Sequence, residues 1–197
     1  ILNNSGTFTT SFNGTVYHYY GGTKLTINNS GTFAKTDGTS TTNLDAIFNN
    51  SGTISVQKGI LAIAGGGSSS GTIDVSANAI LALTAGDYTF ASGSVLDGAG
   101  MIQIAGATAT LSGATTGTGT FSLSSGFLIG TGALNGLLKL SGGEISGTGT
   151  ITANGGADIT NNVSLYGNRT LSLAGNSNWT GGTIYTGAGA ILNNAGT

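Results

Sequence analysis

The run Asn49-Asn50-Ser51-Gly52-Thr53-Ile54 decides the fold, because close copies of it recur along the chain. Copies begin at Asn3 and Asn28, and the variant Ser68-Ser69-Ser70-Gly71-Thr72-Ile73 follows. Their starts at positions 3, 28, 49 and 68 lie 25, 21 and 19 residues apart. Repeats of this length are typical of proteins in which each unit stacks on the one before it.

A short stretch of alternating apolar and polar residues follows each copy. Further along, Gly-x-Gly-x-apolar replaces the Asn motif, beginning at Gly98, Gly117 and Gly147, and similar alternation follows. Alternation with a period of two predicts strands with one buried side. The first apolar residues predicted to point inward are Ile54, Ile73, Ile102, Phe121 and Leu171, and the second are Val56, Val75, Ile104, Leu123 and Leu173.

A unit of about 20 residues with two or three strands cannot bury an apolar side alone. Stacked units can, if each strand pairs in parallel with its equivalent about 4.8 Å along the axis. An antiparallel sandwich would also have many short strands, but it does not explain why one turn sequence precedes one strand sequence so often. We therefore predict a single continuous parallel β-solenoid over residues 1–197, a right-handed β-helix, since parallel crossovers have that hand. Glycine would form the corners, and stacked asparagines would form ladders.

The composition excludes several other classes of protein. Only 6% of residues are charged, 37 are glycine, and proline and cysteine are absent. Five basic residues cannot form a phosphate-binding track, so no nucleic-acid partner is expected. No apolar run is long enough to cross a membrane, so we expect no membrane insertion. The absence of cysteine removes disulfides and cysteine-based metal sites.

The sequence shows no pattern of catalytic residues. The seven acids are scattered, and the most plausible carboxylate pair is Asp74 with Asp97, if their coils align. His18 is the only histidine, and Arg169, the only arginine, is expected to be solvated beside a turn. We therefore predict a protein that is not an enzyme, with no catalytic, cofactor-binding or metal-binding residues.

Aromatic residues are the better candidates for ligand contact. As a strand, residues 16–20 would place Tyr17 and Tyr19 on one side and Val16, His18 and Tyr20 on the other. Tyrosine rings can stack on sugar faces, so Tyr17 and Tyr19 are possible glycan contacts. Trp179 and Tyr185, which flank a Gly-Gly turn, form a second possible contact.

Two longer runs, Gly66–Val75 and Leu140–Ile151, resemble repeats of large bacterial surface proteins. These are autotransporter passengers, filamentous-haemagglutinin-like adhesins and giant β-strand-repeat proteins. The resemblance covers essentially the whole chain, and it implies an elongated extracellular protein that supplies no catalytic residues. We accordingly expect a structural stalk or fibre segment of a secreted or cell-surface adhesin or matrix protein. The alternatives are a glycan-binding module that uses the exposed aromatics and a carbohydrate-active β-helix enzyme.

The two ends of the sequence match each other. Ile1-Leu2-Asn3-Asn4-Ser5-Gly6-Thr7 and Ile191-Leu192-Asn193-Asn194-Ala195-Gly196-Thr197 differ at one position. This match suggests a long repeat built on the short one, in a fragment of a longer repeat protein. Neighbouring coils or copies are then the expected partners, stacked end to end.

Overall fold

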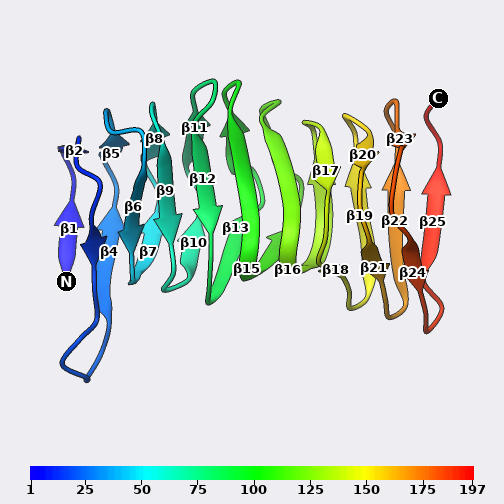
Figure 1. The fold of residues 1–197 in the computed structure, drawn as a ribbon, viewed down its shortest axis with the longest axis horizontal. Coiled ribbons are helices and arrows are strands. Elements are labelled where there is room, and N and C mark those ends of the chain that lie inside the picture. Colours follow the sequence, from blue (N-terminus) through cyan, green and yellow to red (C-terminus); the bar gives the residue numbers. More distant parts are fainter.

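The computed structural model describes residues 1–197 as an all-β chain of 25 strands without a helix. Every strand pairing is parallel, and paired strands lie about 20 residues apart in the sequence. The chain forms a β-solenoid of about 8 turns, with the two termini at opposite ends of its long axis (Figure 1). The predicted fold class is confirmed. The structure holds no helix that is long and apolar enough to cross a membrane.

Each coil contributes strands to three faces, named here by their order in the coil. The first face contains β1 (Leu2–Asn4), β4 (Leu25–Asn29), β7 (Ala46–Asn50), β10 (Gly67–Ser69), β13 (Asp87–Ala91), the end of β15 (Met101–Ser112), the middle of β16 (Thr120–Leu134), β18 (Glu144–Ile145), β21 (Val163–Leu165) and β24 (Ile184–Thr186). The second face contains β2 (Thr7–Thr10), β5 (Thr32–Lys35), β8 (Thr53–Val56), β11 (Thr72–Val75), β14 (Val95–Asp97), the end of β16, β19 (Gly149–Ala153), β22 (Arg169–Leu173) and β25 (Ile191–Asn194). The third face contains β3 (Thr15–Val16), β6 (Thr41–Leu44), β9 (Ile60–Ile63), β12 (Ile80–Leu83), the starts of β15 and β16, β17 (Leu138–Leu140), β20 (Ala157–Ile159) and β23 (Asn178–Trp179).

The core is one column of 37 buried residues inside the coils. All ten residues predicted to point inward are buried, at 4% exposure or less, so that prediction is confirmed. The Gly-x-Gly-x-apolar motif nevertheless precedes strands of different faces. The strand after Gly98 lies on the third face, whereas the strand after Gly147 lies on the second.

The glycine of the repeated motif is required by close stacking of backbones. A Cβ atom on Gly52 would lie 2.1 Å from the carbonyl oxygen of Gly31 in the coil before. Gly71 meets the oxygen of Gly52 at the same distance, and Gly31 that of Gly6. Any side chain here would push successive coils apart, so the glycine column sets how closely they stack at this corner.

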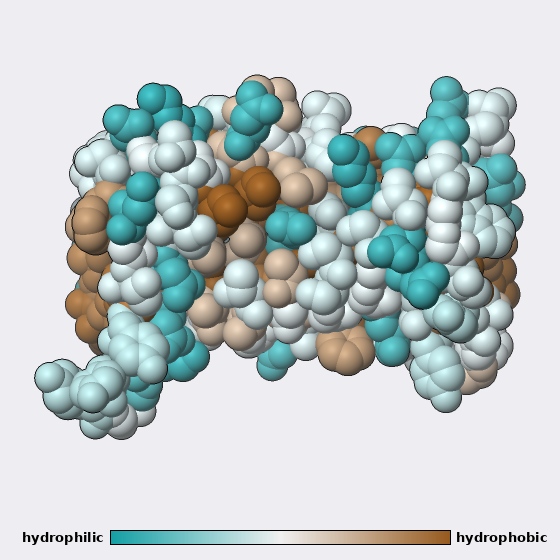
Figure 2. Space-filling view, in the orientation of Figure 1, coloured by the Kyte–Doolittle hydropathy of each residue, from teal (hydrophilic) through white to brown (hydrophobic).

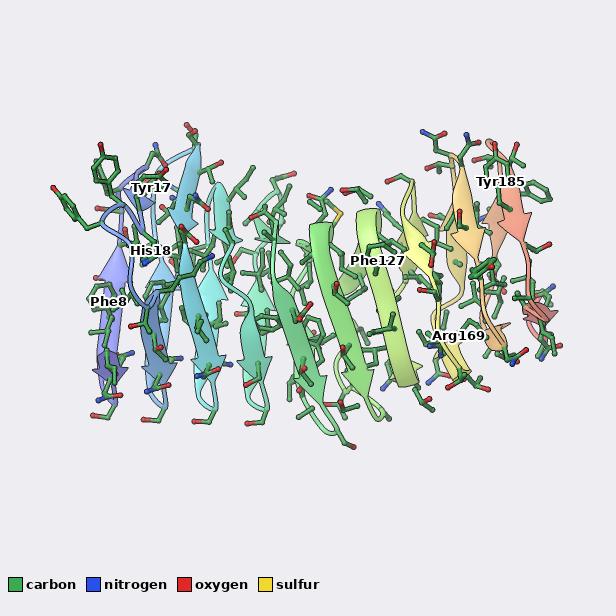
Figure 3. The ribbon with its side chains drawn as sticks, turned by 90° about the horizontal axis from the view of Figure 1, so that it is seen from below. Phe8, Tyr17, His18, Phe127, Arg169 and Tyr185 are labelled. Atoms are coloured by element: carbon green, nitrogen blue, oxygen red, sulfur yellow. The ribbon has the colours of Figure 1, made fainter.

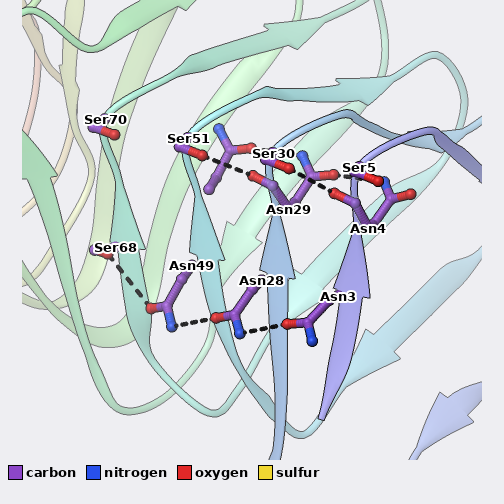
Figure 4. A pocket seen from close by; sticks show the side chains of 11 residues that line it. Asn3, Asn4, Ser5, Asn28, Asn29, Ser30, Asn49, Ser51, Ser68 and Ser70 are labelled. Atoms are coloured by element: carbon purple, nitrogen blue, oxygen red, sulfur yellow. Dashed lines mark hydrogen bonds between the residues drawn. The ribbon is translucent and has the colours of Figure 1, made fainter.

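The asparagines of the motif form two hydrogen-bonded ladders, as predicted (Figure 4). The inner ladder is largely buried, and each Nδ2 donates to the next coil. Its bonds run from Asn4 to Asn29 at 2.7 Å, from Asn29 to Asn50 at 2.7 Å and from Asn50 to the Ser69 hydroxyl at 3.1 Å. The outer ladder is more exposed, and it donates in the opposite direction. Its bonds run from Asn28 to Asn3 at 2.9 Å, from Asn49 to Asn28 at 3.1 Å and from Ser68 to Asn49 at 3.4 Å.

The outward surface of the third face is less polar than expected. Ile60, Ile80 and Met101 lie in register on the outer side of β9, β12 and β15, and they are half-buried. Figure 2 shows apolar side chains gathered in this part of the surface, left of the centre. Alternation predicted a polar outer side for these strands, and this prediction fails here, where the buried Ala62 and Ala82 follow on the same side.

The end coils leave inward-pointing residues exposed. Phe8 stacks on Phe33 with ring centroids 5.2 Å apart, yet it is 42% exposed. At the other end Leu192, in register with the core residue Leu171, is 41% exposed. The two matching terminal sequences do not occupy equivalent places, because β1 lies on the first face and β25 on the second.

Candidate functional site

The stretch around His18 forms a projecting loop and not the strand that the sequence suggested. Strand β3 ends at Val16, and the loop of residues 17–24 leads to β4 and projects from the body of the solenoid (Figures 1 and 2). Tyr17, Tyr19 and Tyr20 are 68%, 73% and 96% exposed. Tyr20 thus lies outside with the other two tyrosines, and the predicted alternation is wrong for it.

The tyrosine rings of this loop contact one another. The ring centroids of Tyr17 and Tyr19 are 6.0 Å apart, and those of Tyr19 and Tyr20 are 5.0 Å apart at an edge-to-face angle of 87°. The structure therefore brings together the two tyrosines that the sequence singled out.

An ion pair lies at the base of the loop. Lys24 Nζ is 2.7 Å from a carboxylate oxygen of Asp45. The hydrogen bond from Lys24 has the largest effect on the pKa of Asp45 and lowers it. Burial raises this pKa, whereas the positive charge of Lys24 and the backbone N–H of His18 lower it further. The pKa of Asp45 therefore lies below its usual range. Asp45 is consequently a carboxylate whose charge is matched by a neighbouring ammonium group.

A cavity of about 210 Å³ lies between the loop and the body, and its lining includes Val16, His18, Tyr20, Leu25 and Asp45. The Nε2 atom of His18 is buried and has no hydrogen-bond partner. A buried polar atom without a partner calls for an explanation, since most such atoms are satisfied.

Tyr185 lies at the opposite end of the solenoid axis from Tyr17 (Figure 3), and Trp179 belongs to β23 near that same end (Figure 1). Trp179 occupies an inward position in register with Ile159, and its indole N–H donates to the carbonyl oxygens of Gly181 and Gly182 at 3.0 and 3.2 Å. Its ring borders a cavity of about 160 Å³ at the open end of the core. Tyr185 points outward, in register with Ser164. The structure therefore brings Tyr17 and Tyr19 together but not Trp179 and Tyr185, which lie on different faces and point inward and outward respectively.

The predicted carboxylate pair is in register. Asp74 of β11 pairs with Asp97 of β14 on the exposed side of the second face. The next residue in this column is Ser55, and no group of three His, Cys, Asp or Glu side chains that could hold a metal ion is present. The pair offers two neighbouring carboxylates without a partner base or cation from the chain.

Arg169 is not solvated, which corrects the expectation from the sequence. It is completely buried, and burial holds the pKa of its guanidinium below the usual value. It donates to the carbonyl oxygen of Ser146 from both Nε, at 3.1 Å, and Nη2, and to that of Gly130 from Nη1. One side chain, labelled in Figure 3, thus has hydrogen bonds to the two coils before its own.

Lys35 is a second buried cation that the sequence reasoning missed. Its Nζ donates to Asp37 O and Thr42 Oγ1 at 3.0 Å and to Asn13 Oδ1 at 3.2 Å. Burial lowers its pKa, and the charge of Asp37 opposes this effect. Alternation could have predicted that both cations point inward. Lys35 lies two residues after the inward Phe33, as Val56 lies two residues after Ile54. Arg169 lies two residues before the inward Leu171.

A polar trough of about 330 Å³ lies beside the outer ladder. Asparagine and serine side chains of four successive coils line it, with no apolar residue (Figure 4). These groups largely satisfy one another across the coils, so the trough is first of all part of the scaffold.

Comparisons of the chain with family models, with curated proteins and with solved structures found no match. The resemblance to bacterial surface proteins therefore stays a prediction.

Proposed function

We propose that this chain is a rigid, non-catalytic stalk or fibre segment of an extracellular or cell-surface protein of the adhesin or matrix type. The observation that carries the proposal is the continuous core of 37 residues, which runs without a break from Ile27 to Leu173. Each added coil extends such a rod by about 4.8 Å and needs no new fold.

Cross-links between coils support a stiff rod. The inner asparagine ladder joins four successive coils, and Arg169 joins three more near the other end. Both lie inside, where water does not compete for the hydrogen bonds. Further coils or copies that stack on the end faces, over Phe8 or Leu192, would continue the rod and bury these side chains.

Duplication of whole coils tests the stalk. Because Phe48, Gly67 and Tyr88 are in register, residues 46–85 span two coils and can be inserted a second time after residue 85. We expect small-angle scattering to show an unchanged cross-section and a maximum dimension about 10 Å longer. A rod that bends at the insert, or no gain in length, would count against the proposal.

Cell-surface location is tested separately. An antibody against this segment should label intact cells that express the complete gene. Labelling only after the cells are opened would reject the extracellular location.

A glycan-binding role is the second candidate, favoured by the three exposed tyrosines of loop 17–24. No observation favours the carbohydrate-active enzyme over these two roles. Turnover of a polysaccharide that a single Asp or Glu substitution abolishes would nevertheless establish it.

A further inference from the structure

The loop of residues 17–24 carries more exposed aromatic surface than its fold requires. Tyr17, Tyr19 and Tyr20 form a row of contacting rings, and none of them belongs to the buried core. Single exposed aromatics occur on many proteins, but a cluster of them beside a cavity is typical of a binding site.

One residue that lines the cavity beneath the rings has unmatched hydrogen-bonding capacity. His18 Nε2 is buried among its lining residues and has no partner in the chain. An imidazole nitrogen can donate or accept one hydrogen bond, so a ligand hydroxyl would satisfy it in either protonation state. Figure 3 shows His18 on the body side of the loop, below Tyr17.

The charges at the site cancel. Asp45 is the only carboxylate that lines the cavity, no Lys or Arg lines it, and Lys24 pairs with Asp45 at 2.7 Å. An anionic ligand would approach the carboxylate, and a cationic ligand would have to displace the lysine. The site therefore suits a neutral ligand that has an apolar face and several hydroxyls.

We propose that loop 17–24 binds a neutral hexopyranose unit with equatorial hydroxyls, as in a β-linked glucan. The axial C–H groups of such a sugar form a flat apolar face for Tyr17 and Tyr19, and its hydroxyls reach His18 Nε2 and the Asp45 carboxylate. This inference rests on the second candidate function and is independent of the stalk.

Titration of the 197-residue chain with cellotetraose, followed by calorimetry and by saturation transfer from the tyrosine rings to sugar protons, tests the site. We expect saturable binding with a Kd of about 1 mM, since one shallow site binds few sugar units. Tyr17→Ala or Tyr19→Ala should each weaken binding about threefold to tenfold. His18→Phe, which keeps a ring but removes both nitrogens, should also weaken it.

The matched control is Tyr166→Ala, which removes an exposed tyrosine elsewhere and should leave binding unchanged. Circular dichroism checks that every variant is folded. No saturable binding, binding that survives the Tyr17/Tyr19 double substitution, or tighter binding of tetragalacturonate than of cellotetraose would each overturn the proposal. If cellotetraose does not bind but the scattering dimensions are as expected, the glycan site is rejected and the stalk proposal is unaffected. The failures of the two proposals are therefore distinguishable.

Discussion

The inner asparagine ladder should contribute far more to stability than the outer one, and Asn29→Ala tests this directly. Asn29 is 1% exposed. Its Nδ2 donates to Asn50 Oδ1 at 2.7 Å, to Thr53 O at 3.0 Å and to Gly31 O at 3.2 Å, and its Oδ1 accepts from Asn4. The substitution removes all four of these hydrogen bonds at one corner of the second coil.

The expected cost follows from what is left without a partner. A net hydrogen bond contributes about 1 kcal/mol, and a buried group left unsatisfied costs about 1–3 kcal/mol. Asn50 Oδ1 loses its only side-chain donor in a buried place, whereas Asn4 is partly exposed and can bind water. We expect a total loss of about 2–4 kcal/mol in the free energy of unfolding.

Asn28→Ala is the matched control, because it removes the same atoms from the next residue of β4. Asn28 is exposed, and water can replace its bonds to Asn3 and Asn49. We expect a loss of less than about 1 kcal/mol. Guanidinium denaturation followed by far-ultraviolet circular dichroism measures both variants, and hydrogen exchange of the Thr53 amide reports on the corner itself. Equal costs for Asn28→Ala and Asn29→Ala would refute the reasoning.

Four further substitutions test the buried and stacked groups. Arg169→Ala should lower the free energy of unfolding by about 2–4 kcal/mol, because buried carbonyl groups lose their donors; denaturation that shows a change below about 0.5 kcal/mol would contradict this. Burial depresses the pKa of Lys35 below 10.5 in the folded chain, so the unfolded chain binds more protons and stability should rise as pH approaches 10.5. Lys35→Met should flatten that rise in melting curves taken across the alkaline range, and an unchanged rise would assign it to another group. The hydroxyl of Tyr88 is buried and makes no hydrogen bond of good geometry, so Tyr88→Phe should be neutral or stabilising by up to about 1 kcal/mol; a clear loss of stability would show that Tyr88 bonds to the nearby Ser69 hydroxyl. Asp97→Asn should stabilise the chain by about 0.2–1 kcal/mol at neutral pH by relieving repulsion from Asp74, and the gain should shrink in high salt.

Only part of the candidate site in loop 17–24 could be predicted from the sequence. The sequence singled out Tyr17 and Tyr19, because exposed aromatics are readable from composition and position alone. Alternation placed His18 on the side opposite Tyr17 and Tyr19, but it did not indicate that Asp45 and Lys24 pair beneath it. Those contacts join two successive coils, and their approach depends on how the loop leaves β3, which alternation predicted wrongly.

The sequence by itself determined the parallel solenoid, the inward residues, the glycine corners and the asparagine ladders. Each of these is a local or periodic property: alternation with a period of two fixes the side of a strand, and a repeated turn places equivalent residues one coil apart. Only the tertiary structure decided which face each strand occupies, because the separation of paired residues varies from 28 between Val16 and Leu44 to 17 between Leu128 and Ile145. These differences add up along the chain. They place the strands after Gly98 and Gly147 on different faces, stack Asp97 on Asp74 and bring Arg169 to the carbonyl group of Gly130, 39 residues before it.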